Sequence, residues 1–165
     1  MIKRIFRPKN LSRENSLHIV EGTVLAIPVS SGEWALGQVI YPGVDFYLGV
    51  CSKIFYEPLS ASDIDGCVFD MFSWTNDAEV FSGNWERLGE FNIKWSFDLP
   101  EYKVTNSGKM IVRSFSGDNW REFIPGKDDH LQYRTVRSPL LIQDAIQAAC
   151  GYGEWKSFYD RMKTI

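Results

Sequence analysis

Residues 22–56 read GTVLAIPVSSGEWALGQVIYPGVDFYLGVCSKIFY, and this stretch decides the fold. Apolar positions alternate with others along it, and the alternation is interrupted by a Ser-Ser-Gly turn and then by a Tyr-Pro-Gly turn. Alternation bounded by such turns is typical of antiparallel β-hairpins. The stretch therefore predicts a three-stranded meander, with strands near 22–29, 33–41 and 44–56.

Further strands are predicted on both sides of the meander, followed by helices. The expected strands are a short edge strand at 2–7, strands at 67–74 and 85–91, and a late hairpin of 109–115 with 120–124. Ser138-Pro139 indicates the start of a helix, because Ser caps free amides and Pro fits the first helical position. Apolar residues recur at helical spacing from there to Gly151, which is the expected end of the helix. A second short amphipathic helix is expected around Trp155 to Met162.

These elements predict an α+β fold in a single domain that comprises residues 1–165. We expect a strongly bent antiparallel β-sheet, similar to a half-open barrel, that is closed by the C-terminal helices. The aromatic content of 15% favours such a β-rich fold, because rings pack well across strands. The predicted core lies on the apolar faces of the meander and the helices. Its expected members are Ile27, Leu36, Val39, Phe46, Leu48, Ile142, Ile146 and Phe158.

The charge is unevenly distributed along the chain. The formal net charge is −3, which argues against a general nucleic-acid binder, since such a protein needs a basic face. Residues 57–86 hold seven acidic residues and no Lys or Arg. This stretch forms either a set of solvated loops and strand ends or a negative surface that steers a basic partner.

Cysteine usage and the N-terminal sequence bear on the compartment. Cys51, Cys67 and Cys150 fit no metal-binding or redox spacing, so we expect reduced and mostly buried thiols. The basic N-terminal sequence MIKRIFRPKN is not followed by the apolar stretch of a signal peptide. No run of residues is apolar enough to predict a membrane span. We therefore expect a cytoplasmic protein without membrane contact.

No motif in the sequence predicts catalysis. Phosphate-binding loops, nucleophile elbows, zinc-protease motifs and dinucleotide-binding glycine patterns are all missing. His18 and His130 have no partner at a metal-binding spacing, and Asp63 with Asp65 lacks the rest of a calcium loop. We therefore expect no catalytic residue, no metal and no cofactor.

One family resemblance follows from the opening stretch. It combines a Gly, an alternating run ending in Ala-Ile-Pro, a Gly turn, an aromatic residue, a second Gly and a branched residue. In this pattern the chain resembles the immunity protein 26 family, whose members are bacterial antitoxins of polymorphic and contact-dependent toxin systems. The residues that carry the resemblance are Gly22, Ala26, Ile27, Pro28, Gly32, Trp34, Gly37, Val39 and Tyr47. It covers residues 20–56 and does not extend over 57–125. Gln38 stands where a basic residue would be expected, so no polar site is carried over there.

The resemblance implies a protein that binds a cognate toxin domain and neutralises it by occlusion, without turnover. A nuclease is one candidate for the toxin, and its basic surface would suit the acidic stretch. The candidate contacts are Asp63, Asp65, Asp77 and Glu79, which lie in predicted loops or strand ends. The alternatives are a small β-barrel that binds nucleic acid or peptide and, less favoured, a small hydrolase. The sequence leaves the oligomeric state open.

Overall fold

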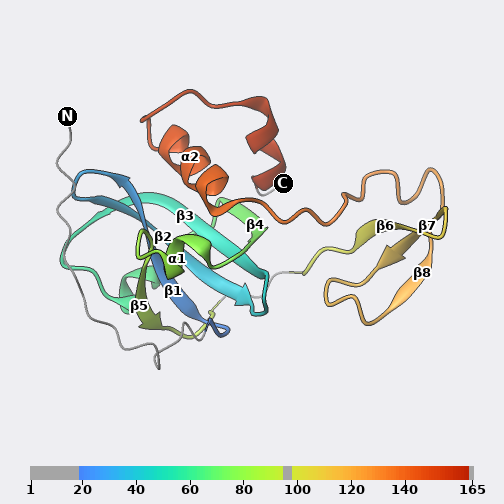
Figure 1. Ribbon diagram of the computed structural model, residues 1–165, viewed down its shortest axis with the longest axis horizontal. Helices are drawn as coiled ribbons and strands as arrows, with labels where there is room; N and C mark the ends of the chain where they lie inside the picture. Colours follow the sequence, from blue (N-terminus) through green and yellow to red (C-terminus); the bar gives the residue numbers. More distant parts are fainter. Residues whose placement is uncertain (1–18, 95–97, 164–165) are drawn as a thin grey trace.

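The computed structural model describes residues 19–94 and 98–163. Its main element is a five-stranded antiparallel sheet with the order β4-β3-β2-β1-β5 (Figure 1). The strands are β1 (Thr23–Ser30), β2 (Glu33–Tyr41), β3 (Phe46–Tyr56), β4 (Met71–Thr75) and β5 (Glu86–Glu90). The meander predicted from residues 22–56 is therefore confirmed as β1 to β3. The predicted edge strand at 2–7 lies outside the described residues.

Two features shape the five-stranded sheet, namely irregular strand pairing and a glycine in the middle of β2. The β1–β2, β2–β3 and β1–β5 pairs each contain a shift of register, and bulges of this kind increase the local twist. At Gly37 a Cβ atom would lie 3.0 Å from Leu48 Cδ1 and 3.3 Å from Ile27 Cδ1. Gly37 thus lets two core side chains close over the centre of β2.

Both faces of this sheet are covered. On one face lie α1 (Ala78–Phe81), α2 (Pro139–Ala149) and the 3₁₀ helix η2 (Ser157–Met162), around a core that includes Ile27, Ile146 and Tyr159. On the other face lies the 3₁₀ helix η1 (Ala61–Ile64), which packs with Cys51, Cys67 and Phe69 in a second cluster. Among the described residues, no helix is long and apolar enough to cross a bilayer.

Seven of the eight predicted core residues are buried, and the prediction for Phe158 is wrong. Phe158 is 47% exposed, whereas its neighbour Tyr159 is only 2% exposed. The reason is that the short helix expected here is a 3₁₀ helix, which comprises residues 157–162. Side chains in a 3₁₀ helix repeat every three residues, so Tyr159 and Met162 share the inward face.

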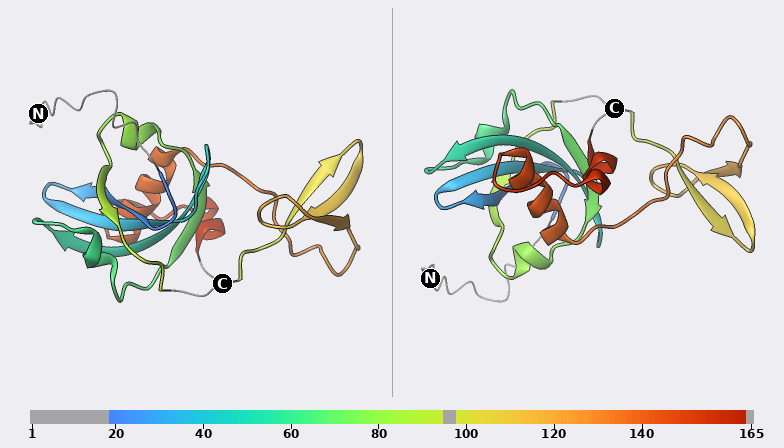
Figure 2. Two further views of the ribbon diagram at one scale, coloured as in Figure 1. Left: turned by 90° about the horizontal axis from the view of Figure 1, so that it is seen from below. Right: turned by 90° about the horizontal axis from the view of Figure 1, so that it is seen from above.

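A second antiparallel sheet projects from the first and is named here the arm, residues 98–136. It contains β6 (Tyr102–Asn106), β7 (Lys109–Arg113) and β8 (Trp120–Glu122) in the order β6-β7-β8. Figures 1 and 2 show the arm extending away from the body in every view. The α+β class is thus confirmed, but the strands form two sheets, and neither sheet is closed into a barrel. The predicted late hairpin corresponds to β7 and β8.

An aromatic cluster fixes the base of the arm to the body. Phe115, two residues after β7, is 6% exposed and stacks on Trp74 of β4, with ring centroids 4.8 Å apart. Tyr47 and Tyr41 contact the Phe115 ring edge-on, with centroid distances of 4.9 and 5.3 Å. Where the chain returns from the arm, the guanidinium carbon of Arg134 lies 3.7 Å from the centroid of Trp74. Contacts from the β7–β8 turn and from the returning connection therefore hold the arm to one edge of the sheet.

Candidate protein-binding surfaces

The four predicted contact residues do not form one surface. Asp63 lies in η1 and Asp65 just after it, whereas Asp77 lies just before α1 and Glu79 within it. These two helices pack on opposite faces of the five-stranded sheet. Both views of Figure 2 show η1 and α1 at opposite sides of the body. The structure therefore divides the acidic stretch into two separate patches.

The two acids of η1 are used in contacts within the chain. Asp63 Oδ2 accepts a hydrogen bond from the Ser60 backbone amide at 2.7 Å, which completes a capping box. Asp65 pairs with Lys94, whose Nζ lies 2.7 and 2.8 Å from its two carboxylate oxygens. Lys94 offsets the negative charge at Asp65, so this patch has less charge to offer a partner.

The acids near α1 are differently placed. Asp77 precedes the helix, is exposed, and its side chain makes no hydrogen bond or ion pair with any residue of the described ranges. Glu79 is half-buried and accepts a hydrogen bond from the Asn84 side-chain amide. Next to them Phe81 is 80% exposed. This patch combines free negative charge with apolar surface.

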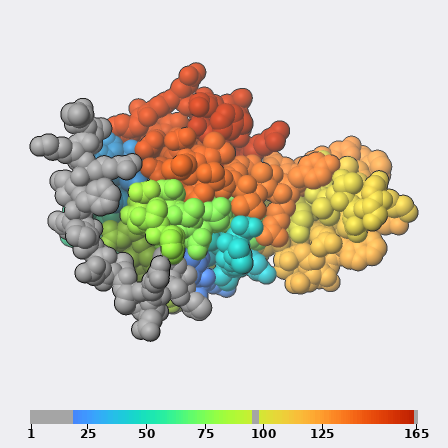
Figure 3. All heavy atoms as spheres, in the orientation of Figure 1, coloured from blue at the N-terminus to red at the C-terminus, as the bar shows by residue number. Residues whose placement is uncertain are grey.

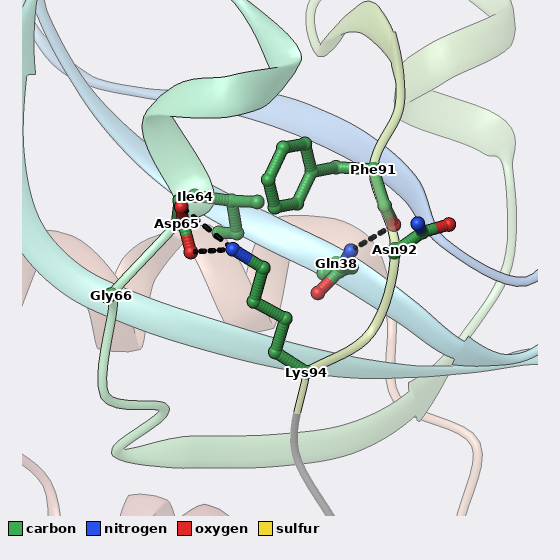
Figure 4. A pocket seen from close by; sticks show the side chains of 7 residues that line it. All are labelled: Gln38, Ile64, Asp65, Gly66, Phe91, Asn92 and Lys94. Carbon is green, nitrogen blue, oxygen red and sulfur yellow. Dashed lines mark hydrogen bonds and ion pairs between the residues drawn. The ribbon is translucent and has the colours of Figure 1, made fainter.

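A small cavity next to η1 has no room for a substrate. Its volume is about 10 Å³, which suffices for about one water molecule. Figure 4 shows the Lys94–Asp65 pair and the Gln38 side chain among the residues that line it. Gln38 is 2% exposed and donates to the Phe91 carbonyl at 2.7 Å. Gln38 thus ties the chain after β5 to the centre of β2, which is a structural role.

The three cysteines and His130, the residues most suited to catalysis or metal binding, lie at separate or buried places. Cys51 and Cys67 are buried in the same cluster. Burial is the main cause, and the neighbouring Cys51 a second one, that raises the pKa of the Cys67 thiol to about 12. Cys150 donates its thiol to the Ser52 carbonyl at 2.9 Å. His130 is exposed, and His18 lies outside the described residues. Within the described ranges, no group of three or more His, Cys, Asp or Glu could hold a metal ion. The predicted lack of a catalytic centre stays a prediction.

An ion pair between a buried aspartate and a partly exposed arginine organises the arm. Asp128 is 1% exposed and receives two hydrogen bonds from Arg121 of β8, at 2.6 and 2.8 Å, and one from the Ile124 amide at 2.8 Å. Arg121 also contacts Glu101 at 2.8 Å. The Arg121 guanidinium and then the Ile124 amide hold the pKa of Asp128 well below its usual range. The pair fixes the loop after β8 against the face of the arm that carries Arg121.

We expect this pair to make the arm sensitive to acid. The pKa of Asp128 is lower in the folded than in the unfolded chain. Its ion pair therefore stabilises the folded chain fully at neutral pH, and this stabilisation is lost as the pH falls below about 4. Asp128→Asn should therefore lower the Tm at neutral pH, and the difference from wild type should shrink below about pH 4. Thermal melts over a pH series measure this. Asp118→Asn, at an exposed position of the same arm, is the control, and a difference for Asp128→Asn that stays constant into acid would contradict the assignment.

The opposite face of the arm carries an exposed tryptophan. Trp120, Arg113 and Tyr102 lie side by side across β8, β7 and β6, as the strand registers require. Trp120 is 66% exposed. The Arg113 side chain makes no hydrogen bond or ion pair within the described ranges, and its Nε atom is buried without a partner. We name Tyr102, Arg113 and Trp120 the arm face. Sequence reasoning missed it, although the Trp-Arg-Glu run after a turn was the available signal.

Comparisons with protein-family models, with curated proteins and with solved structures find no match to this chain.

Proposed function

We propose that this protein is an immunity protein, which binds a cognate bacterial toxin domain in the cytoplasm and neutralises it by occlusion, without turnover. The proposal joins the resemblance of residues 20–56 to the immunity protein 26 family with the surfaces described above. The observation that carries it is the arm, which presents Trp120 at 66% exposure on an element anchored to the body.

The composition of the arm face supports protein binding. Trp, Tyr and Arg are the residues most enriched among those that dominate binding energy at protein interfaces. The arm face contains one of each, and its Arg113 side chain makes no hydrogen bond or ion pair within the described ranges. Met110, Ile124 and Tyr133 add further exposed apolar surface elsewhere on the arm, at 37%, 47% and 51% exposure. Large exposed apolar side chains on a projecting element favour a protein-docking role.

The anchoring of the arm supports occlusion as the mechanism. An inhibitor that blocks a site gains most when its contact element is already ordered, because less conformational entropy is lost on binding. Phe115 of the β7–β8 turn and Arg134 of the returning connection both pack on Trp74 of the body, and the Arg121–Asp128 pair orders the loop after β8. A pre-ordered arm can enter or cover a concave site on a toxin domain at low entropic cost.

Co-expression tests this function. The toxin domain encoded next to this gene is placed under an inducible promoter, with and without this protein, and survival is measured. Wild-type protein should restore growth and co-purify with the toxin domain. Neighbouring genes that encode no toxin, or a toxin that kills equally in the presence of this protein, would overturn the proposal. A gel-shift series with single- and double-stranded DNA and RNA serves as the counter-test, and binding there without toxin binding would favour the nucleic-acid alternative.

A further inference from the structure

We propose that a basic surface of the partner docks on the face formed by α1 and α2, and not on the η1 side of the sheet. This inference rests on the proposed function and adds a second contact surface to the arm face, with a stated chemistry. The Phe81 face is defined by Asp77 and Phe81 of the α1 segment and by Leu140 and Asp144 of α2. Figure 3 shows the two segments in contact on one face of the molecule, α1 in light green and α2 in orange.

The apolar side chains of the Phe81 face are exposed on helices that are packed firmly against the core. Phe81 is 80% exposed and Leu140 is 54% exposed. Val80, which precedes Phe81, is only 6% exposed and belongs to the core that also contains Ile142 and Ile146 of α2. Trp85 is 1% exposed and donates its indole N–H to Gln143 of α2 at 2.9 Å. Both helices are thus held in place, and Phe81 projects from a fixed base.

The charges on this face have one sign. The stretch 57–86 that contains α1 has no Lys or Arg, and neither does α2 over residues 139–149. Asp77 and Asp144 are exposed, and the side chains of both lack hydrogen-bond and ion-pair partners within the described ranges. Leu140 and Asp144 are spaced four residues apart, so they share one side of α2. An apolar centre with unpaired carboxylates around it complements a basic surface that carries apolar or aliphatic groups.

The basic groups nearest to this face in sequence are directed elsewhere. Arg137, at the start of α2, donates to the Ser73 hydroxyl at 3.2 Å, and burial lowers its pKa. Arg87 of β5 pairs with Glu90 at 2.6 Å. On the opposite side of the sheet, Lys94 is bound to Asp65. Of the two acidic patches, the one around α1 therefore keeps more uncompensated charge and also has the exposed aromatic ring.

The test compares charge reversal on the two sides of the sheet. Stopped-flow association with the toxin domain encoded next to this gene is measured at several ionic strengths for wild type, Asp77→Lys/Asp144→Lys and Asp63→Lys/Asp65→Lys. Both double variants change the net charge equally, so only the position differs. The α1–α2 variant should associate at least about tenfold more slowly at low salt, with a flatter salt dependence, whereas the η1 variant should stay close to wild type. If the η1 pair does not fold with lysines, Asp63→Asn/Asp65→Asn is compared with Asp77→Asn/Asp144→Asn.

A second variant tests direct contact. Phe81→Ala should leave the association rate unchanged and raise the dissociation rate about tenfold or more, because truncation of a contacting side chain acts mainly on dissociation. Equal slowing by both charge-reversed pairs, a larger effect of the η1 pair, or an unchanged dissociation rate for Phe81→Ala would overturn the inference. If wild type itself does not bind the toxin domain, the proposed function fails. If wild type binds and the Phe81-face variants bind as well as it does, only this inference fails.

Discussion

Trp120→Ala should weaken binding to the cognate toxin domain by about thirtyfold or more. Truncation of a central tryptophan at a protein interface typically costs about 2 kcal/mol or more, and each 1.4 kcal/mol corresponds to a factor of about ten in Kd. Trp120 is 66% exposed on the arm face, so its removal takes away contact surface without opening a cavity in the folded protein. Isothermal titration calorimetry gives the Kd, and surface-coupled kinetics should show the loss mainly in the dissociation rate.

A matched control separates this effect from a general loss of apolar surface. Val68 is 65% exposed and lies between Cys67 and Phe69, which pack on the η1 side of the sheet. Val68→Ala should bind the toxin domain as wild type does. If Trp120→Ala keeps wild-type affinity, or if Val68→Ala loses as much, the arm face is not the binding surface.

Ile146→Ala should lower the free energy of unfolding by roughly 2 to 5 kcal/mol, the usual cost of removing a fully buried aliphatic side chain down to Cβ. Ile146 of α2 is 0% exposed and packs in the core that joins the helix to β1 and β3. The cost contains the lost burial of the removed atoms and the cavity that remains, because the surrounding side chains relax only in part. Urea unfolding followed by tryptophan fluorescence measures the loss.

Leu140→Ala is the control for Ile146→Ala on the same helix. Leu140 is 54% exposed, so its truncation should change the stability by no more than about 0.5 kcal/mol. Equal stabilities for wild type and Ile146→Ala would mean that α2 does not dock on the sheet as described. That result would also remove the rigid base on which the Phe81 face depends.

The fold was predictable where the pattern and the turns agree. Strands β1 to β3 are runs rich in apolar residues and are separated by turns that contain Gly or Pro-Gly, so their bounds follow from the sequence. Strand β6 was missed, although Asn106-Ser107-Gly108 marks its turn. Ser107 and Gly108 have φ angles of 49° and 77°, as a two-residue hairpin of the primed type requires. The break at Leu99-Pro100 hid a short strand that this turn signal would have revealed.

The candidate surfaces were only partly predictable. The run of acids in residues 57–86 is visible in the sequence, but its division between two faces is not. Residues between η1 and α1 form β4, which adds to the edge of the sheet, and the chain thereby passes from one face to the other. Alternation on β8 shows that Trp120 and Arg121 point to opposite sides. The alternation does not show which face of the arm the loop with Asp128 covers. Because Asp128 binds Arg121, the loop covers the Arg121 face and leaves Trp120 exposed.

The most direct test of the proposed function is a titration of toxin activity with this protein. Toxin-domain activity is measured at a fixed toxin concentration well above the Kd, against increasing amounts of wild type and of Trp120→Ala. We expect activity to fall linearly and to reach zero at one protein per toxin domain, and Trp120→Ala to need a larger excess in proportion to its weaker binding. Complete inactivation by substoichiometric protein would show turnover and contradict occlusion. A tight complex that leaves the toxin active would contradict it as well.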